Sequence, residues 1–182
     1  MRWTIPNILT LLRIALIPVF MLAYYLPVSW SHVATTAIFG LAAITDWFDG
    51  YLARRLGQTS PFGAFLDPVA DKLIVAVALI VLVQSNPTLV FVIPASIIVG
   101  REIAISALRE WMAELGERAQ VAVSTIGKVK TTAQMTALLM LLYHQPLWGL
   151  PTRDVGMALL YIAAALTLWS MVIYLKAAWP LL

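Results

Sequence analysis

The stretch "DWFDGYLARRLGQTSPFGAFLDPVAD", from Asp46 to Asp71, places four aspartates inside a 182-residue chain that is 62% hydrophobic. Only 12% of all residues are charged and the mean hydropathy is +0.89, whereas soluble domains are about 45–50% apolar and about 25% charged. The composition therefore predicts an integral membrane protein. The scattered basic residues form no patch for nucleic acid, and the absence of cysteine excludes disulfides, thiol catalysis and thiolate metal sites.

Six apolar stretches separated by short polar segments determine the predicted fold. Each has close to the ~20 residues that a helix needs to cross a ~30 Å hydrocarbon core. We expect an all-α, polytopic membrane protein whose six transmembrane helices form a single domain, residues 1–182. The expected helices lie at residues 5–25, 32–54, 64–84, 88–112, 124–143 and 154–176.

The basic residues near the helix ends predict how the chain is oriented. The turns on one side of the bundle contain Arg153 as their only basic residue. The termini and the turns on the other side carry Arg2, Arg54, Arg55, Arg118 and Lys176. Because cytoplasmic loops carry the excess of Lys and Arg, we expect both termini and the aspartate-rich stretch to face the cytoplasm.

The four aspartates are spaced so that they gather at one place. On a helix with about 100° per residue, Asp46 and Asp49 share a stripe of one helix, and Asp67 and Asp71 share a stripe of the next. The short turn between these helices, with Pro61 at the first helical position, makes them antiparallel neighbours. Pairing with cations at the membrane interface would explain any single aspartate, but the spacing favours one cluster of four.

Such a cluster predicts a metal site, because four neighbouring negative charges need bound cations to offset their repulsion. Carboxylate oxygens without His or Cys select hard ions such as Mg²⁺, Mn²⁺ or Ca²⁺. Gly50 and Ala53 lie on the same stripe as Asp46 and Asp49 and leave a shallow gap. Small residues serve helix packing in many membrane proteins, but beside these carboxylates we favour a bound ligand.

The complete spacing Asp46-x2-Asp49-Gly50-x2-Ala53-Arg54-x8-Gly63-x3-Asp67-x3-Asp71 resembles the signature of the CDP-alcohol phosphotransferase family. The resemblance extends to "REIAISALREWMAELG" (101–116) and "VAVSTIGKVKTTAQM" (121–135), where the chain is most similar to the bacterial members that make phosphatidylglycerol phosphate. It implies a six-helix membrane enzyme, usually a homodimer, that uses two divalent cations, Mg²⁺ or Mn²⁺, to displace CMP from a CDP-linked lipid with an alcohol.

The resemblance also implies roles for individual residues. Asp46, Asp49 and Asp67 match the metal ligands, and Asp71 either completes the metal site or acts as the general base. Nucleotide contacts are implied for the remaining signature residues and for one face of the first helix: Gly50, Ala53, Arg54, Gly63, Asn7 and Thr10. Arg13 lies on that same face, where snorkelling towards the interface is the alternative explanation.

An acceptor that carries its own phosphate needs cations away from the metal site. If the acceptor is glycerol 3-phosphate, the candidates are Arg101 and Arg109 on the fourth helix, with Lys128 and Lys130 at the start of the fifth. The alternative is that the lysines only follow the positive-inside rule, while Arg101 pairs with Glu102 or an aspartate.

The expected reaction joins CDP-diacylglycerol and sn-glycerol 3-phosphate to give phosphatidylglycerol phosphate and CMP at the cytoplasmic face of a bacterial inner membrane. The motif alone does not choose the acceptor, so phosphatidylglycerol and inositol phosphate remain alternatives. A divalent-cation transporter also clusters carboxylates, but its pathway needs polar residues across the whole membrane. The outer half of this chain is almost purely apolar, which disfavours transport.

Overall fold

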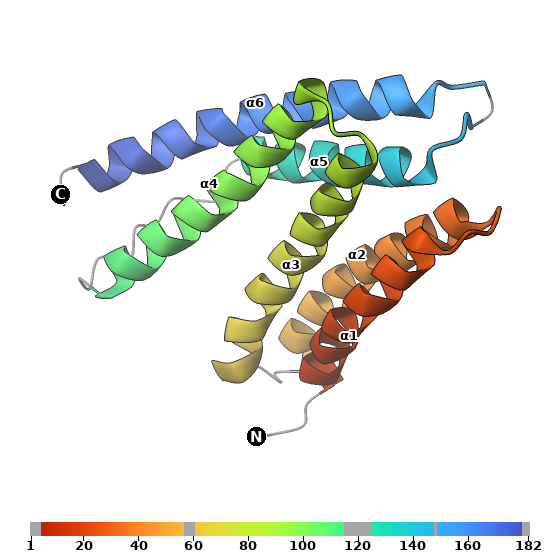
Figure 1. The fold of residues 1–182 in the computed structure, drawn as a ribbon. Coiled ribbons are helices and arrows are strands. Elements are labelled where there is room, and N and C mark those ends of the chain that lie inside the picture. Colours follow the sequence, from red (N-terminus) through yellow and green to blue (C-terminus); the bar gives the residue numbers. More distant parts are fainter. Residues whose placement is uncertain (1–4, 57–60, 115–124, 148, 180–182) are drawn as a thin grey trace. The chain divides into compact units, whose positions relative to one another are not determined.

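The computed structural model describes residues 5–56, 61–114, 125–147 and 149–179, and within the helices it leaves the side chains at several positions, including 49–56 and 109, outside the description. The described residues form six α-helices (Figure 1). Their bounds are α1 Ile5–Tyr25, α2 Ser31–Leu56, α3 Pro61–Ser85, α4 Leu89–Glu114, α5 Thr125–Tyr143 and α6 Thr152–Ala178.

The predicted all-α fold and its six helices are confirmed in the described part of the chain. α3 begins at Pro61 as expected, because a proline at the first helical position gives up no intrahelical hydrogen bond. The same helix continues through Pro68, one turn further on.

Two compact units make up the chain. Unit 1 comprises Met1–Leu82 with Leu142–His144, and unit 2 comprises Val83–Leu141 with Gln145–Leu182. In unit 1, α1 packs along α2, and the rings of Phe20 and Phe39 lie fully buried with their centroids 6.3 Å apart.

In unit 2, α4 packs against α6 and α5 approaches α6 at a glycine. A Cβ atom added to Gly156 would lie 2.9 Å from the Leu141 side chain. A larger residue would therefore push the two helices apart. Membrane helices commonly have glycine at such contacts, because it lets their backbones approach closely. The packing holds α4, α5 and α6 around the polar residues described below.

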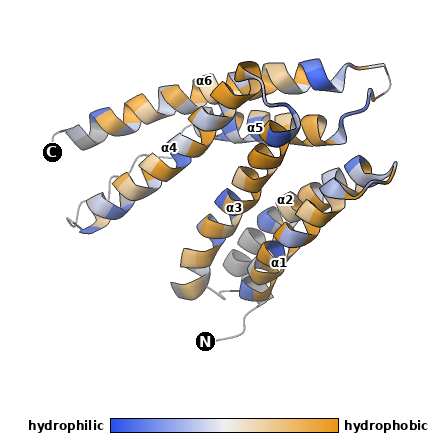
Figure 2. Ribbon diagram, viewed as in Figure 1, coloured by the Kyte–Doolittle hydropathy of each residue, from blue (hydrophilic) through white to orange (hydrophobic). Residues whose placement is uncertain are grey.

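Three described helical segments are long and apolar enough to cross a membrane: Asn7–Tyr25, Leu89–Glu114 and Thr152–Lys176. Hydrophobic residues predominate along α1, α4 and α6 (Figure 2). Only 22% to 28% of each span's most apolar window is buried inside the protein, so most of its apolar side chains face outward, as contact with lipid requires. The chain is a multi-pass membrane protein, and spans in α2, α3 and α5 stay a prediction.

Candidate active site

One polar face of α1 lies at the centre of unit 1. Asn7, Thr10 and Arg13 follow one another at intervals of three residues, so they share a face of the helix. Their side chains are almost completely buried, with exposed fractions of 2%, 0% and 1%. Buried polar groups in an apolar helix need partners, and α2 and α3 supply them.

The Arg13 guanidinium joins the two aspartate-bearing helices. Its Nη1 atom donates to Oδ1 of Asp46 on α2 at 2.9 Å, and to Oδ1 of Asp71 on α3. Thr10 Oγ1 donates to Oδ1 of Asp67, one turn before Asp71. We name these residues, Arg13, Asp46, Asp67 and Asp71, the carboxylate cluster.

The carboxylate cluster corrects one sequence interpretation. Snorkelling by Arg13 is wrong, because its side chain is 1% exposed and its charge is held by carboxylates inside the unit. The carboxylates themselves remain open, since the side chains of Asp46 and Asp71 are 44% and 45% exposed. Gly63, a predicted nucleotide contact, is buried one turn before Asp67 on α3.

The donor set of this cluster fits a hard divalent cation. Asp46 and Asp71 converge on a single nitrogen atom from different helices, so their oxygens can equally approach a cation placed between them, and carboxylate oxygens are the ligands that Mg²⁺ and Mn²⁺ prefer. Among the side chains that the structure describes, no three His, Cys, Asp or Glu residues lie close enough together to hold a metal ion. The fourth predicted ligand, Asp49, and the predicted nucleotide contacts Gly50, Ala53 and Arg54 have side chains outside the described part.

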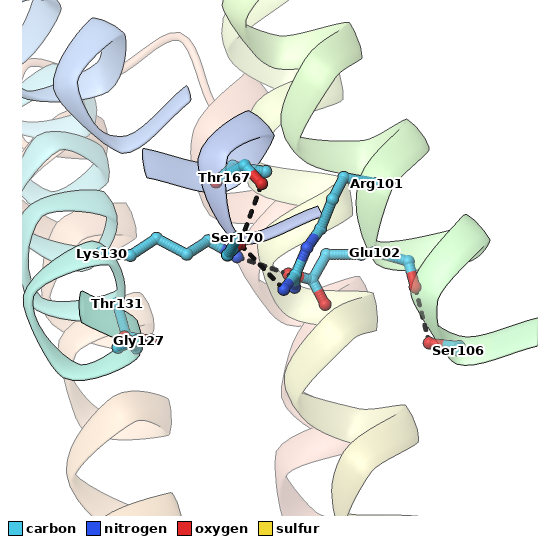
Figure 3. A network of polar contacts seen from close by, with 8 residues as sticks. All are labelled: Arg101, Glu102, Ser106, Gly127, Lys130, Thr131, Thr167 and Ser170. Carbon is cyan, nitrogen blue, oxygen red and sulfur yellow. Dashed lines mark hydrogen bonds and ion pairs between the residues drawn. The ribbon is translucent and has the colours of Figure 1, made fainter. Parts of the chain in front are cut away.

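A second charged group lies in unit 2 (Figure 3). Oε1 of Glu102 on α4 accepts from Nη1 of Arg101 at 2.9 Å and from Nζ of Lys130 on α5 at 2.7 Å. Both cations are well buried, with side chains 10% and 8% exposed, while Glu102 is 26% exposed. We name these three residues the cation cluster.

Helix α6 holds the far side of the Arg101 guanidinium. Nη2 of Arg101 donates to Oγ of Ser170 at 3.1 Å, and Ser170 Oγ donates in turn to the Thr167 carbonyl at 2.9 Å (Figure 3). The guanidinium carbon also lies 5.7 Å from the centroid of the Tyr174 ring, a favourable distance for a cation against an aromatic face. Residues of α4 and α6 thus fix the position of one positive charge.

The described parts of α4, α5 and α6 carry three buried polar atoms without partners. Arg101 Nε, Gln134 Oε1 and Thr167 Oγ1 are buried and have no hydrogen-bond partner among the described residues. Gln134 lies one turn beyond Lys130 on α5, and Thr167 lies beside Ser170 on α6. Because native proteins satisfy most buried polar groups, these three atoms are candidates to contact a polar ligand or ordered water.

The predicted acceptor residues are only partly brought together. Arg101 and Lys130 meet at Glu102, as the alternative interpretation of Arg101 expected. Lys128 is exposed on α5 and Arg109 has a side chain outside the described part. Sequence reasoning missed Glu102 as the residue joining both cations, and it named Arg13 without its partners, although the three-residue spacing of polar groups on α1 was the available signal.

Comparison with known proteins adds to this geometry. The chain is 57% identical over 178 residues to the CDP-diacylglycerol–glycerol-3-phosphate 3-phosphatidyltransferase of Shigella flexneri serotype 5b (strain 8401), a match that covers 98% of this chain and 96% of the relative. The protein of the same name from Escherichia coli (strain K12) is 56% identical over the same shares of both chains. Residues 3–169, which include the carboxylate cluster and two of the three described spans in full, match one family profile, and the chain therefore belongs to the CDP-alcohol phosphatidyltransferase family.

Proposed function

We propose that this protein transfers the phosphatidyl group of CDP-diacylglycerol to sn-glycerol 3-phosphate, forming phosphatidylglycerol phosphate and CMP. The observation that carries the proposal is the identity of 56–57% with relatives of that name over 98% of the chain. The signature aspartates support it independently, because three of them lie against one face of α1. The activity places the protein in acidic phospholipid synthesis.

The chemistry requires a deprotonated hydroxyl and a stabilised leaving group. A hydroxyl oxygen of glycerol 3-phosphate attacks the phosphorus that carries diacylglycerol, and the bond from that phosphorus to the CMP oxygen breaks. CMP leaves with the electron pair of the broken bond, and Asp71 accepts the hydroxyl proton as general base. A direct transfer needs no covalent intermediate, and the signature contains no Ser, Cys or His that would form one.

Asp46, Asp49, Asp67 and Asp71 would hold the two divalent cations, Mg²⁺ or Mn²⁺. Bound there, such cations neutralise the diphosphate and stabilise the attacking and leaving oxygens. The protein's own contribution is orientation, since Arg13 holds Asp46 beside Asp71 and Thr10 holds Asp67. The nucleotide would then lie against Asn7 and Thr10 and the remaining signature residues, Gly50, Ala53, Arg54 and Gly63.

The cation cluster would bind the phosphate of the acceptor, which does not react. A phosphate oxygen could accept a hydrogen bond from Nε of Arg101, which has no partner among the described residues. Charge-assisted hydrogen bonds from Arg and Lys are among the strongest that proteins make to phosphate. Lys130 lies at the same carboxylate as Arg101. Lys128 and Arg109 complete the proposed set as charges that attract the acceptor.

The proposal includes the topology and assembly of the protein. Six spans in one domain, with both termini and the active site at the cytoplasmic face of a bacterial inner membrane, accord with the distribution of Lys and Arg along the chain. A homodimer is expected because members of the family usually form one. The mass of the detergent-solubilised protein, measured by light scattering, tests the dimer separately from the reaction.

The decisive experiment measures CMP release by purified protein in detergent. CDP-diacylglycerol is supplied with glycerol 3-phosphate, inositol phosphate, serine or phosphatidylglycerol, each with Mg²⁺ and with chelator. We expect metal-dependent release with glycerol 3-phosphate alone. Release with a different acceptor would leave the metal-binding role of the carboxylate cluster intact but overturn the acceptor assignment. No release from folded protein would make a divalent-cation transporter the leading explanation.

A further inference from the structure

The cation cluster contains an acid that the proposed reaction does not use. The carboxylate of Glu102 takes no part in the proposed transfer and does not belong to the aspartate signature. A single oxygen of this carboxylate nevertheless contacts both Arg101 and Lys130. Lys130 belongs to α5, 28 residues further along the chain. One carboxylate therefore links the cation of α4 to the cation of α5.

Two neighbouring cations need such an acid to remain together. Arg101 and Lys130 are both largely buried, and like charges repel one another more strongly in a protein interior than in water. The long side chains also have many rotamers, so without a common partner each would turn towards a separate one. Glu102 offsets the repulsion and limits both side chains to a single arrangement.

The other contacts of Arg101 leave this task to Glu102. Ser170 and Tyr174 hold the guanidinium from α6, but neither contact involves Lys130. Ser106, which lies one turn further along α4, donates to the backbone carbonyl of Glu102 and not to its carboxylate (Figure 3). The carboxylate is free to serve the two cations while its backbone stays in the helix.

We propose that Glu102 is a positioning residue that presents Arg101 and Lys130 together to the phosphate of the acceptor substrate. The proposal rests on the function proposed above, in which these cations bind glycerol 3-phosphate. Glu102 itself touches neither substrate. Its effect is confined to the acceptor, because CDP-diacylglycerol is proposed to lie against the polar face of α1 and the aspartate signature, to which Glu102 does not belong.

The test compares Glu102→Gln with Glu110→Gln, an identical change at an exposed glutamate of the same helix. In Glu102→Gln we expect the KM for glycerol 3-phosphate to rise about tenfold, with kcat and the KM for CDP-diacylglycerol within about twofold of the native values. Glu102→Asp keeps the charge on a shorter side chain and should fall between the two. Glu110→Gln should match the native protein in all three constants.

Three results would overturn the positioning role. A lower KM for glycerol 3-phosphate in Glu102→Gln would mean that the carboxylate competes with the acceptor phosphate for the cations. Equal KM values in the Glu102 and Glu110 variants would mean that the contact has no effect on binding. A comparable loss towards both substrates, together with a lower unfolding temperature, would identify Glu102 as a residue of general structural importance.

A binding measurement separates this inference from the function on which it rests. Inorganic phosphate serves as the probe, and its stabilisation of the protein is followed by thermal unfolding in detergent. The phosphate concentration for half-maximal stabilisation should be about tenfold higher in Glu102→Gln than in Glu110→Gln. If the native protein stabilises with phosphate but releases no CMP, the function fails, and the shift between these variants still decides the role of Glu102.

Discussion

The carboxylate cluster of unit 1 and the cation cluster of unit 2 have opposite compositions. The first combines three described aspartates with one arginine, which contacts two of them, and the second gathers an arginine and a lysine around one glutamate. In each cluster a single residue of the minority charge contacts two residues of the majority charge. The carboxylate cluster has an excess of negative charge and the cation cluster an excess of positive charge, so the first suits metal cations and the second suits a phosphate.

The exposure of the charges also differs between the clusters. In unit 1 the minority residue, Arg13, is buried while Asp46 and Asp71 are nearly half exposed. In unit 2 the majority residues Arg101 and Lys130 are buried and the minority Glu102 is the most exposed of the three. The carboxylates can therefore exchange their partner for cations from solution, whereas the cations are fixed in advance for a small ligand.

The largest effect is expected where the chemistry takes place. Asp71→Asn keeps the size of the side chain but removes the base, and it should lower kcat for CMP release by about a thousandfold, within the range for loss of a general base. Rates are measured with both substrates saturating and Mg²⁺ in excess. Asp154→Asn changes an exposed acid at the start of α6 and should leave kcat unchanged; a loss in Asp71→Asn no greater than in this control would contradict the assignment.

A smaller effect, on stability, tests whether Arg13 substitutes for metal. Arg13→Gln leaves Asp46 and Asp71 without their shared cation and should cost about 2 kcal/mol in chelator, less than a fully buried pair because the carboxylates are half exposed. With excess Mg²⁺ the cost should shrink, since bound cations then neutralise the same carboxylates.

Thermal unfolding of the native protein and the Arg13 variant, each with chelator and with Mg²⁺, measures this dependence. Arg153→Gln provides the matched control, because that arginine is exposed and its guanidinium bonds Asn86 at 3.0 Å in unit 2. An equal loss of stability in chelator and in Mg²⁺ would show that Arg13 and the metal do not share carboxylates.

Much of unit 1 could be predicted from sequence because its information is local. Proline favours the first position of a helix, so the start of α3 at Pro61 could be predicted. Asp67 and Asp71 are four residues apart, which places them on the same face of that helix. The partners of Arg13 lie 33 and 58 residues away. Pairing over such distances depends on how α1 packs against α2 and α3, and no periodicity within one helix contains that information.

Unit 2 shows the same limit at shorter range. The sequence placed Lys128 and Lys130 together because they are two residues apart, but on a helix this spacing turns them about 200° from one another. The structure accordingly buries Lys130 against Glu102 and leaves Lys128 exposed. Their grouping could have been refined from helical geometry alone, whereas the choice of Glu102 as partner required the contact between α4 and α5.

These two lysines provide the smallest and most selective test of the comparison. Lys130→Met removes a buried charge of the cation cluster and should raise the KM for glycerol 3-phosphate about tenfold, equivalent to about 1.4 kcal/mol. Lys128→Met removes an exposed charge two residues earlier on the same helix and should change that KM by less than about twofold. Both variants should keep the native KM for CDP-diacylglycerol. Equal effects on the acceptor would mean that α5 attracts it through general positive charge, and the fixed geometry of the cation cluster would then have no part in acceptor binding.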